Sequence, residues 1–354
     1  MVFLKIQSGY VVLERKLDLK KLYVEITNSC NLSCRMCFRS EWNEKEGFME
    51  RELFLKIISQ AERFPELGEF FFGGIGEPTI HPDFLEFIEL ASRWKVSFST
   101  NGMLIEEMAD EIVKRNVDRI YVSLDCIPPA KSEIGHEPAV DAILALDEAK
   151  EKFGKDKPTI CVEFVVTKEN VKELSKLPEL RKFGVAEIIV SNMIPTSKAL
   201  SEMVVYNLCK EDNPADELVK RCFKGPKYVV PEFRIRTERR CNFVKNRSAV
   251  VRWDGELSPC YRFLHSYTEY VFGRKVEVKS FSFGNLWEKS LEDVWTSDDY
   301  LKFRYIVENS LFASCTDCRH VNGCYYASST EMDCFGNAPN CGDCLWARGV
   351  VICP

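Results

Sequence analysis

Residues 30–37 read Cys-Asn-Leu-Ser-Cys-Arg-Met-Cys, which places the thiols of Cys30, Cys34 and Cys37 at the spacing C-x3-C-x2-C. They follow a short apolar run, residues 22–26, so the pattern predicts a compact metal-binding loop after a strand. A cubane iron–sulfur cluster needs one ligand per iron, and thiolates are the usual ligands. Three cysteines therefore leave one iron open to bind a small molecule. The alternative is a zinc site or three unrelated cysteines, although zinc sites more often pair two C-x2-C units.

The same spacing resembles that of the radical S-adenosylmethionine (SAM) superfamily, in which the open iron chelates the amino and carboxylate groups of SAM. The resemblance implies that Cys30, Cys34 and Cys37 hold a SAM-binding 4Fe–4S cluster and act as the catalytic residues. It also implies that an electron from a low-potential donor such as ferredoxin cleaves SAM to methionine and a 5′-deoxyadenosyl radical, which abstracts hydrogen from the substrate. The protein then supplies positioning and excludes quenchers.

Composition bounds the other possibilities. The chain has 354 residues, 45% of them hydrophobic, which allows a large core in one barrel with an appendage or in two domains. A net charge of −6 shows no basic bias and argues against nucleic-acid partners. The sequence contains no run of 18 apolar residues, so we expect no membrane span. The N-terminus lacks the pattern of a signal peptide. We therefore expect a cytoplasmic protein. In that reducing compartment the 16 cysteines are expected to be ligands or buried side chains rather than disulfides, with the cytosol of hyperthermophiles as the exception.

Short apolar runs alternate with amphipathic stretches over the first 194 residues, which predicts a parallel sheet covered by helices. We expect an α/β fold: a partial (β/α)6 barrel over residues 1–194, a linker over 195–240 with a helix at 215–222, and a small cysteine-rich domain over 241–354 with a helix at 291–307. The predicted strands are 22–27, 69–73, 96–100, 120–124, 160–166 and 187–191. The predicted helices are 50–63, 82–94, 105–115, 139–152 and 170–177.

Polar and glycine-rich motifs follow the predicted strands, at the end of a parallel sheet where ligands bind. Residues 73–78, Gly-Gly-Ile-Gly-Glu-Pro, resemble the Gly-Gly-Glu-Pro element of radical SAM enzymes, whose backbone contacts the SAM amino group. Residues 99–102 and 122–125 end the next two strands. Taken alone, each motif reads as an ordinary turn or cap, and Asn170 as a helix N-cap. The resemblance implies SAM contacts from Phe38, near the adenine, and from Gly73, Gly74, Gly76, Glu77, Ser99, Asn101, Ser123 and Asp125.

Nine cysteines crowd into the last 114 residues, and crowded, motif-spaced cysteines are usually ligands. Their spacing resembles the SPASM extension of radical SAM maturases, which implies two auxiliary 4Fe–4S clusters. Here the cysteine after Cys324 comes ten positions later instead of four. Two fully ligated cubanes need eight thiolates, so the pairing stays open, and a pair of structural zinc sites is the alternative. The candidate ligands are Cys241, Cys260, Cys315, Cys318, Cys324, Cys334, Cys341, Cys344 and Cys353.

Residues 253–260, 284–286 and 333–346 resemble more narrowly the radical SAM proteins associated with tungsten-containing aldehyde ferredoxin oxidoreductases. That resemblance implies a maturase acting on the tungsten cofactor or on the apoenzyme, with that oxidoreductase as a partner. A peptide- or protein-modifying maturase is the alternative within the superfamily. A non-catalytic iron–sulfur carrier or a zinc-stabilised scaffold is the alternative outside it. For His265 we expect a surface or packing role, with lining of the substrate cavity as the alternative.

Overall fold

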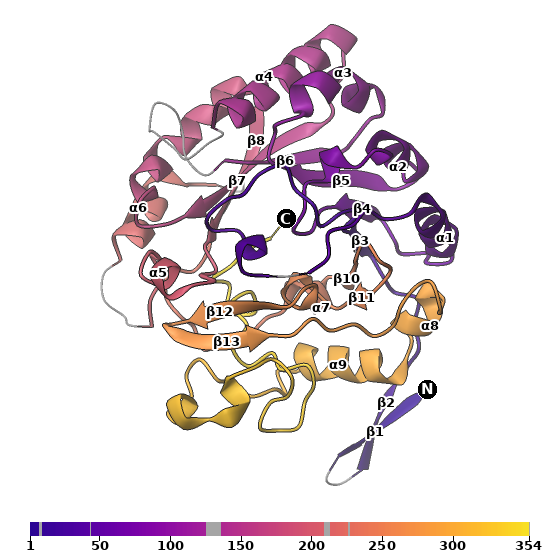
Figure 1. Ribbon diagram of the computed structural model, residues 1–354, viewed down its shortest axis with the longest axis vertical. Coiled ribbons are helices and arrows are strands. Elements are labelled where there is room, and N and C mark those ends of the chain that lie inside the picture. The colour runs from indigo at the N-terminus through magenta and orange to yellow at the C-terminus, as the bar shows by residue number, and fades with distance from the viewer. Residues whose placement is uncertain (7–8, 43, 125–135, 209–212, 226, 354) are drawn as a thin grey trace.

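The computed structural model describes residues 1–6, 9–42, 44–124, 136–208, 213–225 and 227–353. Over these residues the central sheet has the strand order β11-β10-β3-β4-β5-β6-β7-β8-β9 and curls around the middle of the molecule (Figure 1). The strands from β3 to β8 are parallel neighbours in chain order and match the six predicted strands. This arrangement confirms the α/β class and the partial (β/α)6 barrel. These strands are β3 (Lys21–Val24), β4 (Glu69–Phe72), β5 (Lys95–Thr100), β6 (Arg119–Ser123), β7 (Thr159–Val166) and β8 (Val185–Asn192).

Helices cover the outer face of the barrel (Figure 1). The core between sheet and helices is aromatic: the rings of Phe54 and Phe87 stack with centroids 4.1 Å apart, and Phe72 lies 5.8 Å from Phe54. Each of these side chains is fully buried, which contributes roughly 1.5–3 kcal/mol apiece. The helices α1 (Arg51–Ala61), α2 (Phe84–Leu90), α3 (Ile105–Lys114) and α4 (His136–Phe153) fall where the amphipathic patterns predicted them.

Two predicted helices differ from the structure. Residues 170–177 form 3-10 turns, η3 (Val171–Ser175) and η4 (Leu177–Phe183), instead of an α-helix. Pro178 lacks the N–H that a continuing helix needs, and the Asn170 side chain bonds back to the end of β7 instead of capping. The helix predicted over 291–307 is split into α8 (Leu291–Trp295) and α9 (Asp298–Glu308), because Ser297 accepts the N–H of Tyr300 and starts a new helix.

Strands from beyond residue 194 extend the sheet at both edges. At one edge β9 (Tyr228–Val229) pairs with β8, and at the other β10 (Ser248–Val251) pairs in parallel with β3. β11 (Leu257–Ser258) then adds antiparallel to β10. The helix predicted at 215–222 is present as α6 (Pro214–Cys222). The other elements of this half are α5 (Lys198–Ser201), α7 (Asn242–Lys245), β12 (Tyr267–Val271), β13 (Arg274–Val278), η5 (Tyr261–Phe263), η6 (Val321–Gly323) and η7 (Tyr325–Ala327).

The two ends of the chain lie in contrasting places. The N-terminal hairpin of β1 (Val2–Ile6) and β2 (Gly9–Leu13) projects from the body, whereas the C-terminal end comes to the middle of the barrel (Figure 1). Two further 3-10 turns, η1 (Phe38–Glu41) and η2 (Pro78–Ile80), lie in the loops after β3 and β4. Within the described ranges, no helix has the length and apolar character needed to cross a membrane.

Candidate active site at the carboxyl ends of the strands

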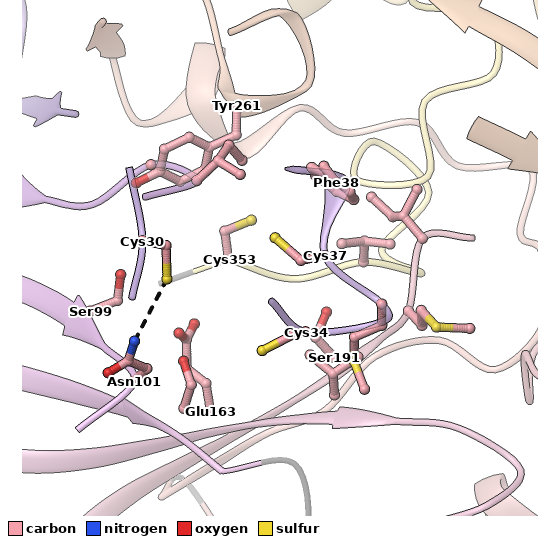
Figure 2. Close-up of a pocket in the computed structure, with 18 of the residues that line it drawn as sticks. Cys30, Cys34, Cys37, Phe38, Ser99, Asn101, Glu163, Ser191, Tyr261 and Cys353 are labelled. Atoms are coloured by element: carbon pink, nitrogen blue, oxygen red, sulfur yellow. Dashed lines mark hydrogen bonds between the residues drawn. The ribbon is translucent and has the colours of Figure 1, made fainter. Parts of the chain in front are cut away.

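A cavity of about 340 Å3 opens at the carboxyl ends of the parallel strands. Cys30, Cys34 and Cys37 line it from the loop that follows β3, and Figure 2 shows their side chains around the same space. Burial raises the pKa of the Cys30 thiol, while the N–H of Leu32 donates to its sulfur and lowers it. Asn101 Nδ2 lies 3.7 Å from the same sulfur (dashed in Figure 2). The loop therefore brings together the three thiols that the sequence spacing predicted to lie at one site.

The cysteine loop is fixed at its base by the segment that follows it. Thr27 Oγ1 donates to Gly47 O at 2.7 Å, and Asn28 Oδ1 accepts the N–H of Gly47 at 2.8 Å. Asn28 Nδ2 also donates to Lys45 O at 3.0 Å. These partly buried bonds close the loop into a ring, since both of its ends are held at one place.

The glycine-rich turn after β4 is pressed against this base. A Cβ on Gly76 would stand 2.2 Å from Thr27 O, so only glycine fits there. Glu77 N donates to Ser29 O at 2.9 Å. The Glu77 carboxylate is itself buried and accepts from Thr79, from Thr100 Oγ1 at 2.8 Å and from the N–H of Asn101 at 2.7 Å. Its side chain thereby ties the turn to the end of β5.

Most residues proposed for SAM contact meet in this cavity. Within the described residues the lining includes Phe38, Gly74, Gly76, Glu77, Ser99, Asn101 and Ser123. Gly73 is not part of the lining, and a Cβ there would stand 2.6 Å from the Phe71 ring. Asp125 lies outside the described residues. The Phe38 ring stacks on Tyr267 with centroids 4.7 Å apart, so one of its faces is already covered.

Several lining residues were missed by sequence reasoning. Glu163 lines the cavity from the middle of β7, and a charged residue inside that apolar strand was the available signal. Others come from the end of β8, from η5 and from the C-terminal segment, and no local pattern places them in the cavity; Cys353 was expected as a cluster ligand and not as a cavity residue. They include Ser191, Asn192, Tyr261, Trp346 and Cys353, of which Ser191, Tyr261 and Cys353 appear in Figure 2.

Four C-terminal cysteines gather beside the barrel. Burial raises the pKa of the Cys260 thiol well above its usual range, and the neighbouring Cys241 and Cys344 raise it further. The pKa of Cys341 is raised by burial and then by Cys344, Cys260 and Cys241. The guanidinium of buried Arg262 opposes this effect at Cys344. Each of these four thiols, Cys241, Cys260, Cys341 and Cys344, either affects the pKa of another in the set or has its own pKa raised by one, and the four are named group I here.

A second group of four lies in the loops after α9. Burial raises the pKa of Cys315 to about 12, and Cys334 and Cys324 are among the neighbouring charges that add to it. The N–H of Cys318 donates to Cys315 O at 3.2 Å in the turn of the C-x2-C unit. Cys315 is buried, whereas Cys318 and Cys334 are exposed. Cys315, Cys318, Cys324 and Cys334 are named group II.

The ninth cysteine lies in the barrel cavity. The C-terminal segment is anchored where Ile352 N donates to Ser191 Oγ at 3.0 Å and Asn192 Nδ2 to Val350 O at 2.9 Å. Cys353 then lines the cavity, with its sulfur 2.8 Å from Trp346 Nε1. Burial raises the pKa of its thiol to about 12.

Comparison with known proteins agrees with this geometry. Residues 24–180 match the radical SAM superfamily, and residues 241–319 match the iron–sulfur cluster-binding domain called SPASM. A protein of Pyrococcus furiosus named "Tungsten-containing aldehyde ferredoxin oxidoreductase cofactor-modifying protein" is 46% identical over 346 residues, covering 95% of this chain and 97% of the relative. The chain belongs to the radical SAM superfamily. A "Probable GTP 3',8-cyclase" of Methanocaldococcus jannaschii is 25% identical over 69% of the chain and 85% of its own length.

Solved structures show the same fold at low sequence identity. Streptococcus suis SuiB bound to S-adenosylmethionine aligns with a TM-score of 0.58 at 17% identity, covering 87% of this chain and 73% of its own. Native anSMEcpe with bound AdoMet aligns with a TM-score of 0.56 at 17% identity, covering 93% of this chain and 95% of its own.

Membership confirms the predicted family, fold and cofactors: this radical SAM enzyme uses SAM and a 4Fe–4S cluster, and its SPASM domain binds auxiliary iron–sulfur clusters. Radical SAM chemistry also needs a reductant.

Proposed function

We propose that this radical SAM enzyme is a maturase that acts on the tungsten cofactor, or on the apoenzyme, of an aldehyde ferredoxin oxidoreductase. The observation that carries the proposal is the 46% identity, over nearly the whole of both chains, to the P. furiosus protein with that name. The alignment covers 95% of this chain, so the likeness is not confined to the common barrel. The proposed partners are that oxidoreductase and a low-potential donor such as ferredoxin.

We propose roles for the lining residues from their positions. Cys30, Cys34 and Cys37 form the donor set that a 4Fe–4S cluster with one open iron requires. When bound, the cluster supplies the electron that cleaves SAM to methionine and a 5′-deoxyadenosyl radical. The Asn101 amide orients Cys30, and the Gly74–Gly76 backbone offers polar groups without a Cβ in the way. Phe38, Ser99 and Ser123 line the space left for the nucleoside, and Asp125 stays a proposed contact from the sequence motif.

Groups I and II each offer four thiols, which is the number that a fully ligated cubane takes. We therefore propose group I and group II as the ligands of the two auxiliary clusters. This division leaves Cys353 without a cluster and facing the cavity, so its proposed role is contact with substrate.

The experiment that tests the function uses the protein reconstituted anaerobically with iron and sulfide. With SAM and a low-potential reductant we expect 5′-deoxyadenosine, because the site-differentiated cluster is the electron entry point. Absence of this product would favour the alternative function of a non-catalytic electron carrier or scaffold. Next, the aldehyde ferredoxin oxidoreductase is isolated from cells with and without this chain, and its extracted tungsten cofactor is compared by mass. An unchanged cofactor and unchanged apoenzyme mass would contradict the maturase proposal, and modification of a short precursor peptide would replace it.

Substituting Cys353 with Ala separates a ligand from a cavity residue. We expect the reconstituted variant to keep about twelve irons per chain, the number for three cubanes, and to lose substrate turnover. The matched control is Cys341→Ala in group I, which we expect to lose iron. Iron analysis and Fe–S absorbance provide the measurement. A loss of about four irons from Cys353→Ala would make Cys353 a ligand and overturn the division into two groups.

A further inference from the structure

His265 occupies a buried position between two carboxylates. It follows η5, five residues after Cys260, and its side chain is 1% exposed. Its Nε2 lies 2.9 Å from both oxygens of Glu25, and its Nδ1 lies 2.5 Å from Glu44 Oε2. Trp42 covers the ring at a centroid distance of 4.3 Å. Carboxylates only accept hydrogen bonds when ionised, so a ring that bonds to both donates from both nitrogens and is an imidazolium.

The first carboxylate supports the glycine-rich turn. Glu25 comes directly after β3, and its Oε1 accepts the N–H of Ile75 at 3.0 Å. Gly74, at φ +144°, packs so tightly on this side chain that a Cβ would stand 2.6 Å from Glu25 Cγ. A displacement of Glu25 therefore moves the backbone of residues 74 and 75, which line the cavity.

The second carboxylate belongs to the return of the cysteine loop. Glu44 Oε1 accepts the N–H of Ser266 at 2.8 Å, so the chain at 265–266 holds both of its oxygens. The residues that follow Glu44 are the ones fastened to Thr27 and Asn28, at the base of the loop. The His265 ring thus bonds both to the support of the turn and to the return of the loop.

We propose that His265 is a positioning residue whose paired imidazolium, supplied by the C-terminal part of the chain, holds the Gly74–Gly76 turn and the cysteine loop in the arrangement that binds SAM. The inference rests on the proposed assignment of this cavity as the SAM site. It gives the SPASM domain a second task besides cluster ligation, because the segment that carries Cys260 also carries this ring. His265 touches no reacting atom and acts through Glu25 and Glu44.

The surrounding charges set the pH range. Burial lowers the pKa of His265, but Glu25 and Glu44 raise it more, to about 9 overall. Arg252, paired with Asp254 at 2.6 Å, is the other cation near Glu25 and Glu44. The folded-state pKa of His265 lies above the ordinary value of 6.5. The pairing of its imidazolium with Glu25 and Glu44 therefore stabilises the folded state fully below pH 6.5, and this contribution declines up to about pH 9. The positioning is therefore expected to be lost at alkaline pH.

The test measures SAM affinity of the reconstituted protein anaerobically from pH 6.5 to 10, for wild type and His265→Gln. The amino group of SAM titrates in the same range, so the informative quantity is the difference between the two profiles. We expect the variant to bind about tenfold more weakly at pH 7, the effect of losing a charged hydrogen bond, and the two profiles to converge above pH 9. Iron content should stay unchanged. Equal affinity at pH 7, or a constant ratio across the range, would overturn the proposal.

Two further variants keep the test decisive. Glu44→Gln retains an acceptor for Ser266 N but removes one charge, so it is expected to shift the alkaline loss of SAM affinity to lower pH, and an unshifted midpoint would count against the proposal. The matched control is His81→Gln, another buried histidine, whose Nε2 faces Met49 O and whose pKa is lowered by burial. His81→Gln should lower stability without changing the pH profile of SAM affinity.

If the wild-type protein binds no SAM, the proposed site fails. The pairing itself is then tested by the stability of the apoprotein, which should lose its decline between pH 6.5 and 9 in His265→Gln.

Discussion

Replacing Cys30, Cys34 and Cys37 together with Ala is expected to abolish 5′-deoxyadenosine formation and to remove about four of about twelve irons per chain. The three thiols line one cavity from a single loop, and replacing all three leaves that loop without a thiol. The effect is on chemistry rather than on folding, because the loop base is held by Thr27 and Asn28 through bonds that do not involve sulfur. Iron analysis, Fe–S absorbance and chromatographic detection of 5′-deoxyadenosine are the measurements.

The control for this variant is Cys161→Ala. Cys161 is another cysteine of the barrel, but it is fully buried in β7 among Tyr23, Phe71 and Tyr121. Truncating it should cost stability through a small cavity while iron content and SAM cleavage stay at wild-type levels. Retained 5′-deoxyadenosine production by the triple variant would refute the ligand assignment, and loss of iron in Cys161→Ala would show that the assay reports folding instead.

The barrel could be predicted because each of its strands is a short, nearly continuous apolar run. Strands such as β4 and β6 are buried by helices on one side and by the barrel interior on the other. Each therefore has a run of apolar residues that can be recognised in the local sequence. The cysteine loop was equally local, since its three candidate ligands span eight residues. The break at Ser297 was not predicted, because residues 291–307 keep helical periodicity across it and only the serine cap marks the interruption.

The parts of the site that were not predicted depend on contacts between distant segments. Cys353 and Trp346 reach the cavity because the C-terminal segment bonds to Ser191 and Asn192 at the end of β8. Spacing alone offered nine thiols for eight positions, and it gave no sign of which one would enter the barrel. His265 was expected to be an ordinary surface or packing residue, and it is buried as a packing residue would be. Its two carboxylate partners lie 240 and 221 positions away, beyond any sequence pattern.

In the cysteine-rich C-terminal part of the chain the two cysteine groups are expected to differ in what they stabilise. Two group I cysteines, Cys241 and Cys260, flank in the sequence the strands β10 and β11 of the main sheet. Group II lies in loops whose own apolar cluster contains only Ala313, Cys315 and Ala327 as buried members. A hydrophobic cluster this small cannot order the loops by itself, so the proposed metal ligation is expected to supply much of their stability. Loss of group II should therefore loosen its loops locally, whereas loss of group I should also weaken the sheet.

Adding Cys315→Ala, Cys318→Ala and Cys324→Ala to the triple variant of Cys30, Cys34 and Cys37 tests this. The starting variant should hold about eight irons, and the combined variant about four. Limited proteolysis should then cut within residues 311–340 while the barrel stays intact, because group II is proposed to hold those loops and contributes no strand to the sheet. The matched variant replaces Cys241 and Cys260 on the same background, and it should lose a similar amount of iron but unfold at a lower temperature. If the starting variant, prepared without oxygen, carries stoichiometric zinc and no Fe–S absorbance, both groups are zinc sites. Cysteine spacing alone cannot distinguish iron from zinc, since thiolates bind both. This measurement therefore decides whether the domain holds iron–sulfur clusters or structural zinc.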